Sequence, residues 1–428
     1  MVLSIIIASI TCITLILSIL FFPRIKIGRI GIGTYWIVAL IGATLMIVTS
    51  RVSLSSVFSG LTSSDAINPL KILCLFISMT ILSIFLDEVG FFKHMANIVC
   101  KKAGSNQIKL FLYLYILTSI LTIFTSNDII ILTFTPFIVF FTKNAKINPI
   151  PYLVSEFVAA NTWSMMFIIG NPTNIYLATS FNLGFLDYFK VMILPTIAAG
   201  SVSLGVLYLL FRKELKEEMV IEAKDAHVKS RKLVISEVII LGVCTLILIV
   251  SNYIGIEMYL VALFCALMML GLLVLYSIKK HNTVFLFDGV KRIPWNLAPF
   301  LLSMFVIVLT DKGYQINDKI REFYNHGNSI LVYGASSTLA SNLINNIPMS
   351  VFYSSIIPEN DLGALFSTII GSNIGAFLTP IGALAGIMWL SILKKYEIKY
   401  SFLSFIKYGV IVVIPTLCAS LLTLFLVL

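Results

Sequence analysis

Residues 337–348 read STLASNLINNIP, a polar stretch in a chain that is otherwise rich in Leu, Ile, Val and Phe. Among the amide and hydroxyl side chains that interrupt the apolar pattern are Ser341, Asn342, Asn345 and Asn346. A similar stretch occurs earlier, because TSNDIIILTFTPF (125–137) and ASNLINNIPMSVF (340–352) share a Ser-Asn pair and a following proline. The polar stretch is therefore one of a pair, which indicates an internal repeat.

The composition is that of an integral membrane protein. Of the 428 residues 59% are hydrophobic and 12% are charged, and the mean hydropathy is +1.00, whereas soluble domains carry about 25% charged residues. Apolar runs long enough to cross roughly 30 Å of hydrocarbon recur along the chain. The net charge of +10 lies in loops between these runs, so it indicates topology and not nucleic-acid binding. We expect one membrane unit in the plasma (inner) membrane.

Further pairs of segments support the repeat. In the first half Asn161 lies nine residues before Gly170, and in the second half Asn373 lies nine residues before Gly382. The matches keep their order and nearly the same separation, which predicts a tandem repeat. The additional pairs are ANTWSMMFIIGNPTN (160–174) with SNIGAFLTPIGALAG (372–386), SMTILSIFLDEVGF (78–91) with SMFVIVLTDKGY (303–314), and IVAL (37–40) with LVAL (260–263).

The halves parse alike, which predicts an all-α polytopic membrane protein of two inverted-topology repeats. Each half has three ordinary spans, a segment with a polar middle, a span broken by Gly, Pro or Asn, and a final span. The polar-middle segments are too long for one crossing and resemble re-entrant hairpins, so each half crosses five times and the second half is inverted. The predicted parts are a first repeat at 1–211 with hairpin 108–142 and broken helix 150–180, a cytoplasmic linker at 212–232, and a second repeat at 233–428 with hairpin 328–357 and broken helix 362–392.

Loop charges agree with this parse. If the N-terminus is outside, the predicted inner segments hold 22 Lys and Arg residues and the outer segments hold 4. Cytoplasmic loops are enriched in Lys and Arg, and a wrong hairpin assignment would have removed the asymmetry. We therefore expect ten crossings, two hairpins and both termini outside.

The four polar interruptions form the predicted solute and ion site. In hydrocarbon, non-helical backbone survives only where it lines a protein cavity, and broken helices in inverted repeats build midplane sites in secondary transporters. Isolated Ser, Thr and Asn can also join helices, with Gly and Pro as kinks, but four repeat-related clusters favour a binding site. The predicted binding residues are Thr125, Ser126, Asn127, Asp128, Asn161, Gly170, Asn171, Thr173, Asn174, Ser341, Asn342, Asn345, Asn346, Asn373, Thr379 and Gly382.

These motifs resemble the ion-transporter superfamily of secondary carriers, and within it the arsenite/antimonite efflux permeases. LDEVGFF (86–92), TSNDIIILTFTP (125–136), ASNLINNIP (340–348) and GSNIGAFLTPIGALAGIMW (371–389) are similar to that group's versions in the same order, over essentially the full length. The resemblance implies the hairpin-and-broken-helix fold, alternating access, and a site formed by the Ser-Asn tips and Gly-Pro breaks. One motif departs from the pattern, because GNPTN (170–174) is closer to the superfamily's anion and Na+-linked carriers.

The chemistry of the breaks suits a neutral or weakly charged solute. No Arg, Lys or His falls in any of the four breaks, and Asn, Ser and Thr hydrogen-bond well to hydroxyls. Arsenous acid, an uncharged trihydroxide at neutral pH, fits this set. We predict arsenite or antimonite efflux coupled to a H+ or Na+ gradient. A carrier of a small anion such as a dicarboxylate, citrate or an inorganic oxyanion, a Na+/H+ antiporter and, in a different class, a channel are the alternatives.

Two carboxylates are candidates for ion coupling. Asp128 lies at a break, and an acid within the membrane is functional by default; the alternative is a hydrated residue at the hairpin tip. Glu156, near the start of the first broken helix, is either a second coupling group or an interfacial acid. We expect Asp87 and Glu88 to be boundary charges, one of which could pair with a nearby cation such as Lys93.

Other functional classes leave no trace in the sequence. We find no phosphate loop, no metal-ligand spacing and no catalytic triad, so we expect neither an enzyme nor a cofactor. The six cysteines are scattered without a C-x-x-C pair, which argues against a metal cluster or a disulfide framework. The expected partners are the solute, the coupling ion and the lipid bilayer; a separate ATPase subunit and a homodimer stay open.

The linker allows a test of the predicted topology. Ser230→Cys, placed in a background without the six native cysteines, should resist a membrane-impermeant maleimide in intact cells and react in everted vesicles. The reason is that a basic linker stays in the cytoplasm. Labelling in intact cells would contradict the inverted-repeat parse.

Overall fold

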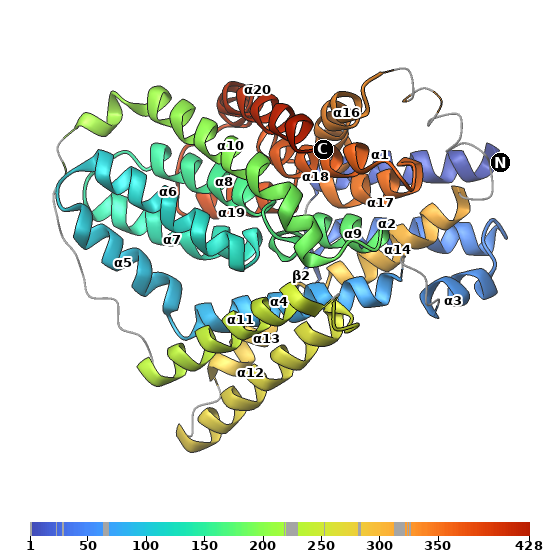
Figure 1. Ribbon diagram of the computed structural model, residues 1–428, viewed down its shortest axis with the longest axis horizontal. Helices are drawn as coiled ribbons and strands as arrows, with labels where there is room; N and C mark the ends of the chain where they lie inside the picture. The colour runs from blue at the N-terminus through green and yellow to red at the C-terminus, as the bar shows by residue number, and fades with distance from the viewer. Residues whose placement is uncertain are drawn as a thin grey trace.

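The computed structural model describes most of the chain (Figure 1). The described residues are 2–22, 24–27, 30–62, 68–217, 219, 230–251, 253–280, 284–311, 322, 324 and 327–428. Most of the predicted 212–232 linker, namely 218 and 220–229, therefore lies outside the described residues.

The first half contains one short β-hairpin among helices. Its strands pair antiparallel, with Ile27 opposite Ile30, and the sequence analysis did not predict it. The elements are α1 (Val2–Phe21), β1 (Arg24–Ile27), β2 (Ile30–Gly33), α2 (Thr34–Val48), α3 (Leu54–Thr62), α4 (Pro69–Glu88), α5 (Phe91–Ala103), α6 (Gln107–Phe124), α7 (Asn127–Asn144), α8 (Ile150–Trp163), the 3-10 helix η1 (Ile168–Gly170), α9 (Pro172–Ser180), α10 (Phe185–Phe211) and η2 (Glu214–Lys216).

The second half repeats this order of long, paired and interrupted helices. The helical fold class is thereby confirmed. Its elements are α11 (Arg231–Ser251), α12 (Met258–Lys280), α13 (Val284–Arg292), α14 (Leu297–Asp311), α16 (Ser329–Ile344), α17 (Asn346–Ile356), α18 (Leu362–Ile374), η3 (Gly375–Phe377), α19 (Leu384–Lys395) and α20 (Phe402–Val427).

Several helices are long and apolar enough to cross a membrane. Helices α11, α12 and α20 expose large apolar side chains such as Leu246, Phe264 and Leu422, the kind of surface that lipid covers. Helix α6 also qualifies by length and composition, although the sequence parse places it in a re-entrant hairpin, so re-entry there stays a prediction. The qualifying helices in the described part of the chain are Pro69–Glu88, Gln107–Phe124, Phe185–Phe211, Arg231–Ser251, Met258–Lys279 and Phe402–Val427.

Asn and Asp side chains determine where spans begin. Asn68 Oδ1 accepts hydrogen bonds from the N–H groups of Leu70 and Lys71 at the start of α4. Asp361 Oδ1 accepts one from the N–H of Ala364 at the start of α18. Each cap satisfies a backbone N–H that has no partner inside its helix, so local sequence fixes these helix starts.

The two halves contact each other through helices at equivalent places in the repeat. Helix α10 runs beside α20, as Figure 1 shows, while α2 packs on α14 and α4 packs on α12. Helix α7 contacts α19, and the equivalent helix α17 contacts α9. Two related halves would give this pattern if each packed its helices on the equivalent helices of the other half. The inversion of the second half stays a prediction.

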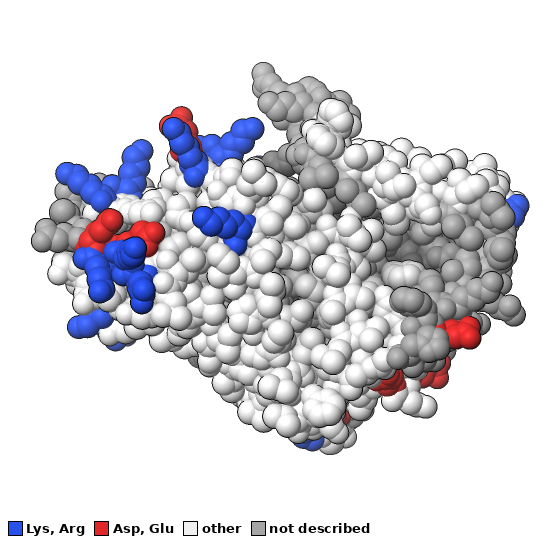
Figure 2. Space-filling model, turned by 90° about the horizontal axis from the view of Figure 1, so that it is seen from above, with Lys and Arg blue, Asp and Glu red and all other residues white. Residues whose placement is uncertain are grey.

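Charge is distributed unevenly over the molecule. Figure 2 shows Lys and Arg gathered mainly toward one end, with a broad uncharged band across the middle of the visible face. The last turns of α5 and α7 carry Lys101, Lys102 and Lys143, all in segments predicted to face the cytoplasm. An uncharged band between charged ends suits a protein embedded in a bilayer.

Candidate functional site

The first broken helix is interrupted between α8 and α9. The chain leaves the α-helix after Trp163 and re-enters it at Pro172. Gly170 has no room for a side chain, because a Cβ there would lie 2.2 Å from the carbonyl oxygen of Ser164. Asn171 Oδ1 accepts a hydrogen bond from the N–H of Thr173 at 3.1 Å and so caps α9. The GNPTN motif therefore has a local purpose, since it packs the break tightly and starts the next helix.

Asn373 of α18 joins the two halves at this break. Its Oδ1 accepts hydrogen bonds from Ser164 Oγ at 3.0 Å and from Asn171 Nδ2 at 2.9 Å. Its Nδ2 donates to Asn174 Oδ1 at 2.7 Å and to the carbonyl of Ile369 at 2.8 Å. The side chain is fully buried, and three of its hydrogen-bond partners, Ser164, Asn171 and Asn174, belong to the other half.

The tip of the first hairpin is two extended residues, Thr125 and Ser126, between α6 and α7. Asn127 Nδ2 donates to Asn161 Oδ1 on α8 at 3.1 Å. Asn161 Nδ2 in turn donates to the carbonyl of Phe157 at 2.8 Å. The first tip is thus held to its own broken helix by one amide-to-amide hydrogen bond.

The tip of the second hairpin is held far more extensively. Asn342 Oδ1 accepts from the N–H of Thr379 at 2.9 Å and from its hydroxyl at 2.7 Å. Asn342 Nδ2 donates to the carbonyl of Gly375 at 2.9 Å. Beside it, Asn345 Nδ2 donates to the carbonyl of Ile381 at 2.9 Å, and the N–H of Asn346 donates to the carbonyl of Gly382 at 3.0 Å.

Asn345 combines a positive φ of 72° with a ψ of 151°, a backbone conformation that residues other than Gly rarely adopt. The chain reverses there between α16 and α17. A Cβ on Gly382 would lie 2.8 Å from Asn342 Oδ1, so the second hairpin tip and the second break are in direct contact.

A cavity of about 660 Å³ opens beside the first hairpin and not the second. Ser126 and Asp128 are the predicted binding residues that line it, and the described residues around it include none from Ser329–Ile356. Helix α19 of the second half contributes apolar side chains. The polar lining residues are Thr80, Asp87, Lys93, Ser126, Asp128, Thr133, Lys291, Arg292 and Asn296.

Three of these lining residues are cations that the sequence analysis did not connect with the site. Lys93 lies in the first turn of α5, and Lys291 and Arg292 end α13, so all three lie far from the polar breaks in the sequence. Arg292 Nη2 bonds Asp87 Oδ2 at 2.6 Å, and Nη1 bonds Glu88 Oε1 at 2.6 Å. Partial burial opposes the charge on Arg292, but these two carboxylates raise its pKa. The sequence analysis named a nearby cation such as Lys93 as a pairing partner, and the structure shows Arg292 pairing with both carboxylates.

Glu156 lies behind the wall of the cavity. Only 1% of it is exposed, and Thr135 Oγ1 lies 3.1 Å from both carboxyl oxygens. The indole of Trp389 on α19 is next to the carboxyl. Glu156 is therefore an interior carboxylate where α7, α8 and α19 meet.

Glu237 is another buried acid, which the sequence analysis did not single out. It lies on α11 and is fully buried. The signal was available, because it is the acidic residue within the otherwise apolar span 233–251. Such residues are functional candidates by default.

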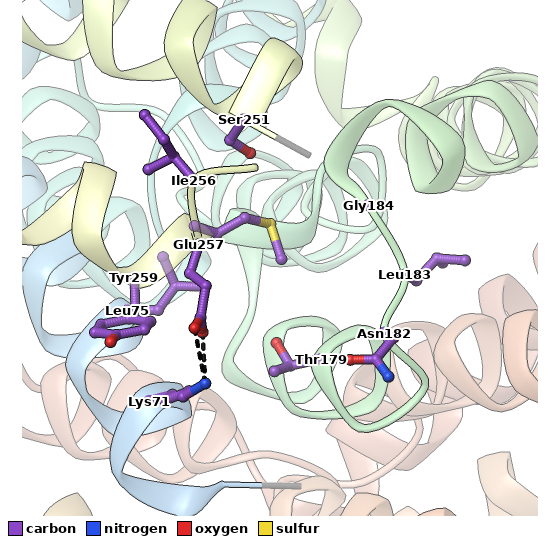
Figure 3. A pocket seen from close by; sticks show the side chains of 11 residues that line it. Lys71, Leu75, Thr179, Asn182, Leu183, Gly184, Ser251, Ile256, Glu257 and Tyr259 are labelled. Carbon is purple, nitrogen blue, oxygen red and sulfur yellow. Dashed lines mark hydrogen bonds and ion pairs between the residues drawn. The ribbon is translucent and has the colours of Figure 1, made fainter. Parts of the chain in front are cut away.

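A smaller pocket of about 140 Å³ lies near the start of α4, beside Lys71 (Figure 3). Lys71 and Glu257 point toward one another across it, with Nζ and Oε2 2.7 Å apart. Thr179 and Asn182 face this space from α9 and the turn that follows it. Helix α4 therefore contributes to both spaces, Lys71 to this pocket and Asp87 to the cavity.

The predicted binding residues are thus brought together in two groups. The first group joins the first tip, the first break and Asn373, and the second group joins the second tip and the second break. Asp128, Asn342 and Thr379 are half-buried, and the others are buried. Neighbours that complete the first group are Ser164 and Ser372, whose hydroxyls bond Asn373 and Thr173.

Comparisons with known proteins agree on a membrane transporter. The model of the citrate transporter family matches residues 34–361. An arsenical pump membrane protein of Escherichia coli K12 is 25% identical over 412 residues, which covers 91% of this chain and 93% of that protein. A putative arsenical pump membrane protein of Bacillus subtilis is 23% identical over 379 residues, covering 81% and 85%. These matches confirm the resemblance that the motifs indicate.

Solved structures share the fold. The YdaH transporter of Alcanivorax borkumensis has a TM-score of 0.57 at 11% identity, with 98% of this chain and 97% of that chain covered. MtrF of Neisseria gonorrhoeae has a TM-score of 0.52 at 13% identity, with 99% and 94% covered. At such low identity the likeness concerns the fold alone.

The unequal hydrogen bonding of the two tips leads to a stability prediction. Asn342→Ala removes three contacts to the second break, whereas Asn127→Ala removes one contact to Asn161. An unpaired buried group costs about 1–3 kcal/mol, so Asn342→Ala should lower the melting temperature in detergent more than Asn127→Ala. We expect both variants to transport poorly. Equal melting temperatures would show that the second tip is not held by Asn342.

Proposed function

This chain belongs to the citrate transporter family, and from its arsenical pump relatives we propose that it exports arsenite or antimonite as a secondary active transporter. It is a multi-pass membrane transporter, with relatives named arsenical pump membrane proteins over most of its length. We propose alternating access as the mechanism and the gradient of H+ or Na+ as the driving force.

The observation that carries the proposal is the cavity lined in part by Ser126 and Asp128. It is large enough for a small solute, and it reaches a non-helical hairpin tip of the kind that lines transport sites. Behind that tip, Asn127 and Asn161 connect it with the first broken helix. A solute at Ser126 would thus contact a segment whose position depends on the broken helix.

The polar lining favours a neutral solute with hydroxyl groups. Ser126, Thr80 and Thr133 offer hydroxyls, and Asn296 offers an amide. Arg292 is already bound by Asp87 and Glu88, so its charge is balanced before a solute enters. Arsenous acid can both donate to and accept from such groups.

A small anion is the second candidate, and two observations favour it. The family is described as citrate transporter, and Lys93 and Lys291 line the cavity. Two lysines could hold a carboxylate or an inorganic oxyanion. This candidate differs from arsenite efflux in charge, so competition between solutes separates them.

We propose that the two halves are inverted repeats with the boundaries 1–211 and 233–428. The exchange of equivalent partners supports this, since α2 packs on α14 as α12 packs on α4. Inverted halves of this kind allow the cavity to close on one side while the pocket at Lys71 and Glu257 opens on the other.

We propose that Asp128, in preference to Glu156, is the carboxylate that couples ion binding to transport. Asp128 lies in the first turn of α7, where the helix dipole stabilises a negative charge, and it lines the cavity. Glu156 is not among the described residues that line the cavity. An ion from the aqueous side therefore reaches Asp128 first.

Transport in everted vesicles tests the function. Vesicles with an imposed pH or Na+ gradient should accumulate arsenite, in a saturable way and against its gradient, while sulfate and citrate are not accumulated. The same vesicles should lose accumulation when the gradient is collapsed. Accumulation of citrate without arsenite would favour the anion carrier, and flux that neither saturates nor runs uphill would favour a channel.

Substitution of Asp128 tests the coupling. Asp128→Asn should abolish uphill accumulation yet keep exchange of solute down its own gradient, because it removes the charge and nearly keeps the shape. Asp187→Asn, at an exposed carboxylate outside the lining of the cavity, is the matched control and should keep uphill transport. If Asp128→Asn still concentrates solute, Asp128 is only a residue of the hairpin tip.

A further inference from the structure

Arg292 lies at the cavity with its guanidinium held by two carboxylates. It comes from the end of α13, and Asp87 and Glu88 come from the end of α4, so the three residues meet only in the folded chain. One guanidinium nitrogen bonds each carboxylate, at 2.6 Å in both cases. This fork is the geometry with which Arg otherwise binds carboxylate or phosphate ligands.

The position of Asp87 makes this arrangement relevant to solutes. Its side chain is 6% exposed and it lines the cavity together with Arg292. Within the described part of the chain its second oxygen, Oδ1, is buried and has no hydrogen-bond partner. Its negative charge is therefore offset mainly by Arg292, and both charges act on whatever enters the cavity.

We propose that Asp87 and Glu88 determine the charge selectivity of the cavity by occupying Arg292. The two carboxylates take the place that an oxyanion would take on the guanidinium. Without them, Arg292 would face the cavity beside Lys93 and Lys291, which is a set suited to citrate, sulfate or arsenate. The inference rests on the proposed function, because it explains how a cavity with three cations accepts a neutral solute and rejects anions.

A purely structural clamp between α4 and α13 is the competing explanation. The two helices also pack directly, because a Cβ on Gly289 would lie 2.4 Å from the ring of Phe85. This apolar contact does not depend on the ion pairs. Removing the carboxylates should therefore change anion binding without separating the helices.

The test measures citrate binding to purified full-length protein by calorimetry. Asp87→Asn/Glu88→Gln should bind citrate at least about tenfold more tightly than the unaltered protein, because freed charge-assisted hydrogen bonds become available to it. Adding Arg292→Gln should remove the gain. Asp87→Glu, which keeps the charge, should show no gain.

A matched control separates the effect of charge at the cavity from the effect of the overall charge of the protein. Asp187→Asn/Glu214→Gln removes the same charge from residues outside the lining of the cavity and should leave citrate binding unchanged. If Asp87→Asn/Glu88→Gln has a much lower melting temperature than the unaltered protein, Glu88→Gln alone is tested instead, because it keeps the ion pair between Asp87 and Arg292. That single variant should still show a smaller gain.

The outcomes are distinct. Unchanged citrate binding in both folded variants, or a gain that survives Arg292→Gln, overturns the proposal. A gain equal to that of the surface control overturns it as well. If the unaltered protein does not transport arsenite but the double variant gains citrate binding through Arg292, the proposed function fails and the selectivity role of Asp87 and Glu88 stands.

Discussion

Backbone that leaves the α-helix inside a membrane has no water to bond, so the protein must supply each partner. In this chain asparagine amides do so at both breaks. Asn174 Nδ2 donates to the carbonyls of Ser164 and Phe167, and Asn345 Nδ2 donates to that of Ile381. Gly170 and Gly382 allow the close approach that these bonds need. The polar stretches are therefore first a solution to a backbone problem, and only the groups left over can bind solute.

The halves solve this problem differently, although their motifs match. Asn161 and Asn373 occupy equivalent positions, but Asn161 bonds the first hairpin and Asn373 bonds the break of the other half. The second tip is bonded to its own broken helix. As a result the cavity reaches the first tip, and Asp128, which has Leu343 as its counterpart in the second repeat, is the acid beside it.

Apart from Asp128, the charged residues of the cavity come from elements outside the polar breaks. Asp87 ends α4, Lys93 lies in α5, and Lys291 and Arg292 end α13. Burying carboxylates inside a protein costs free energy unless each charge has a partner. Arg292 is that partner for both Asp87 and Glu88. These contacts tie the end of α4 to the end of α13.

The sequence by itself predicted the apolar spans, the two interruptions in each half and the order of the proposed repeat. Hydropathy, helix caps such as Asn68, and the Gly and Pro of the breaks act over a few residues, so they can be read locally. It also predicted Ser126 and Asp128 as site residues, and both line the cavity. Only the tertiary structure decided which asparagine amides form hydrogen bonds within the protein. It also decided that Glu156 lies behind the cavity wall and that Arg292 pairs with Asp87. Those choices depend on side chains about half the chain apart in sequence, and only the packing of α4, α13, α18 and the broken helices brings them within hydrogen-bonding distance.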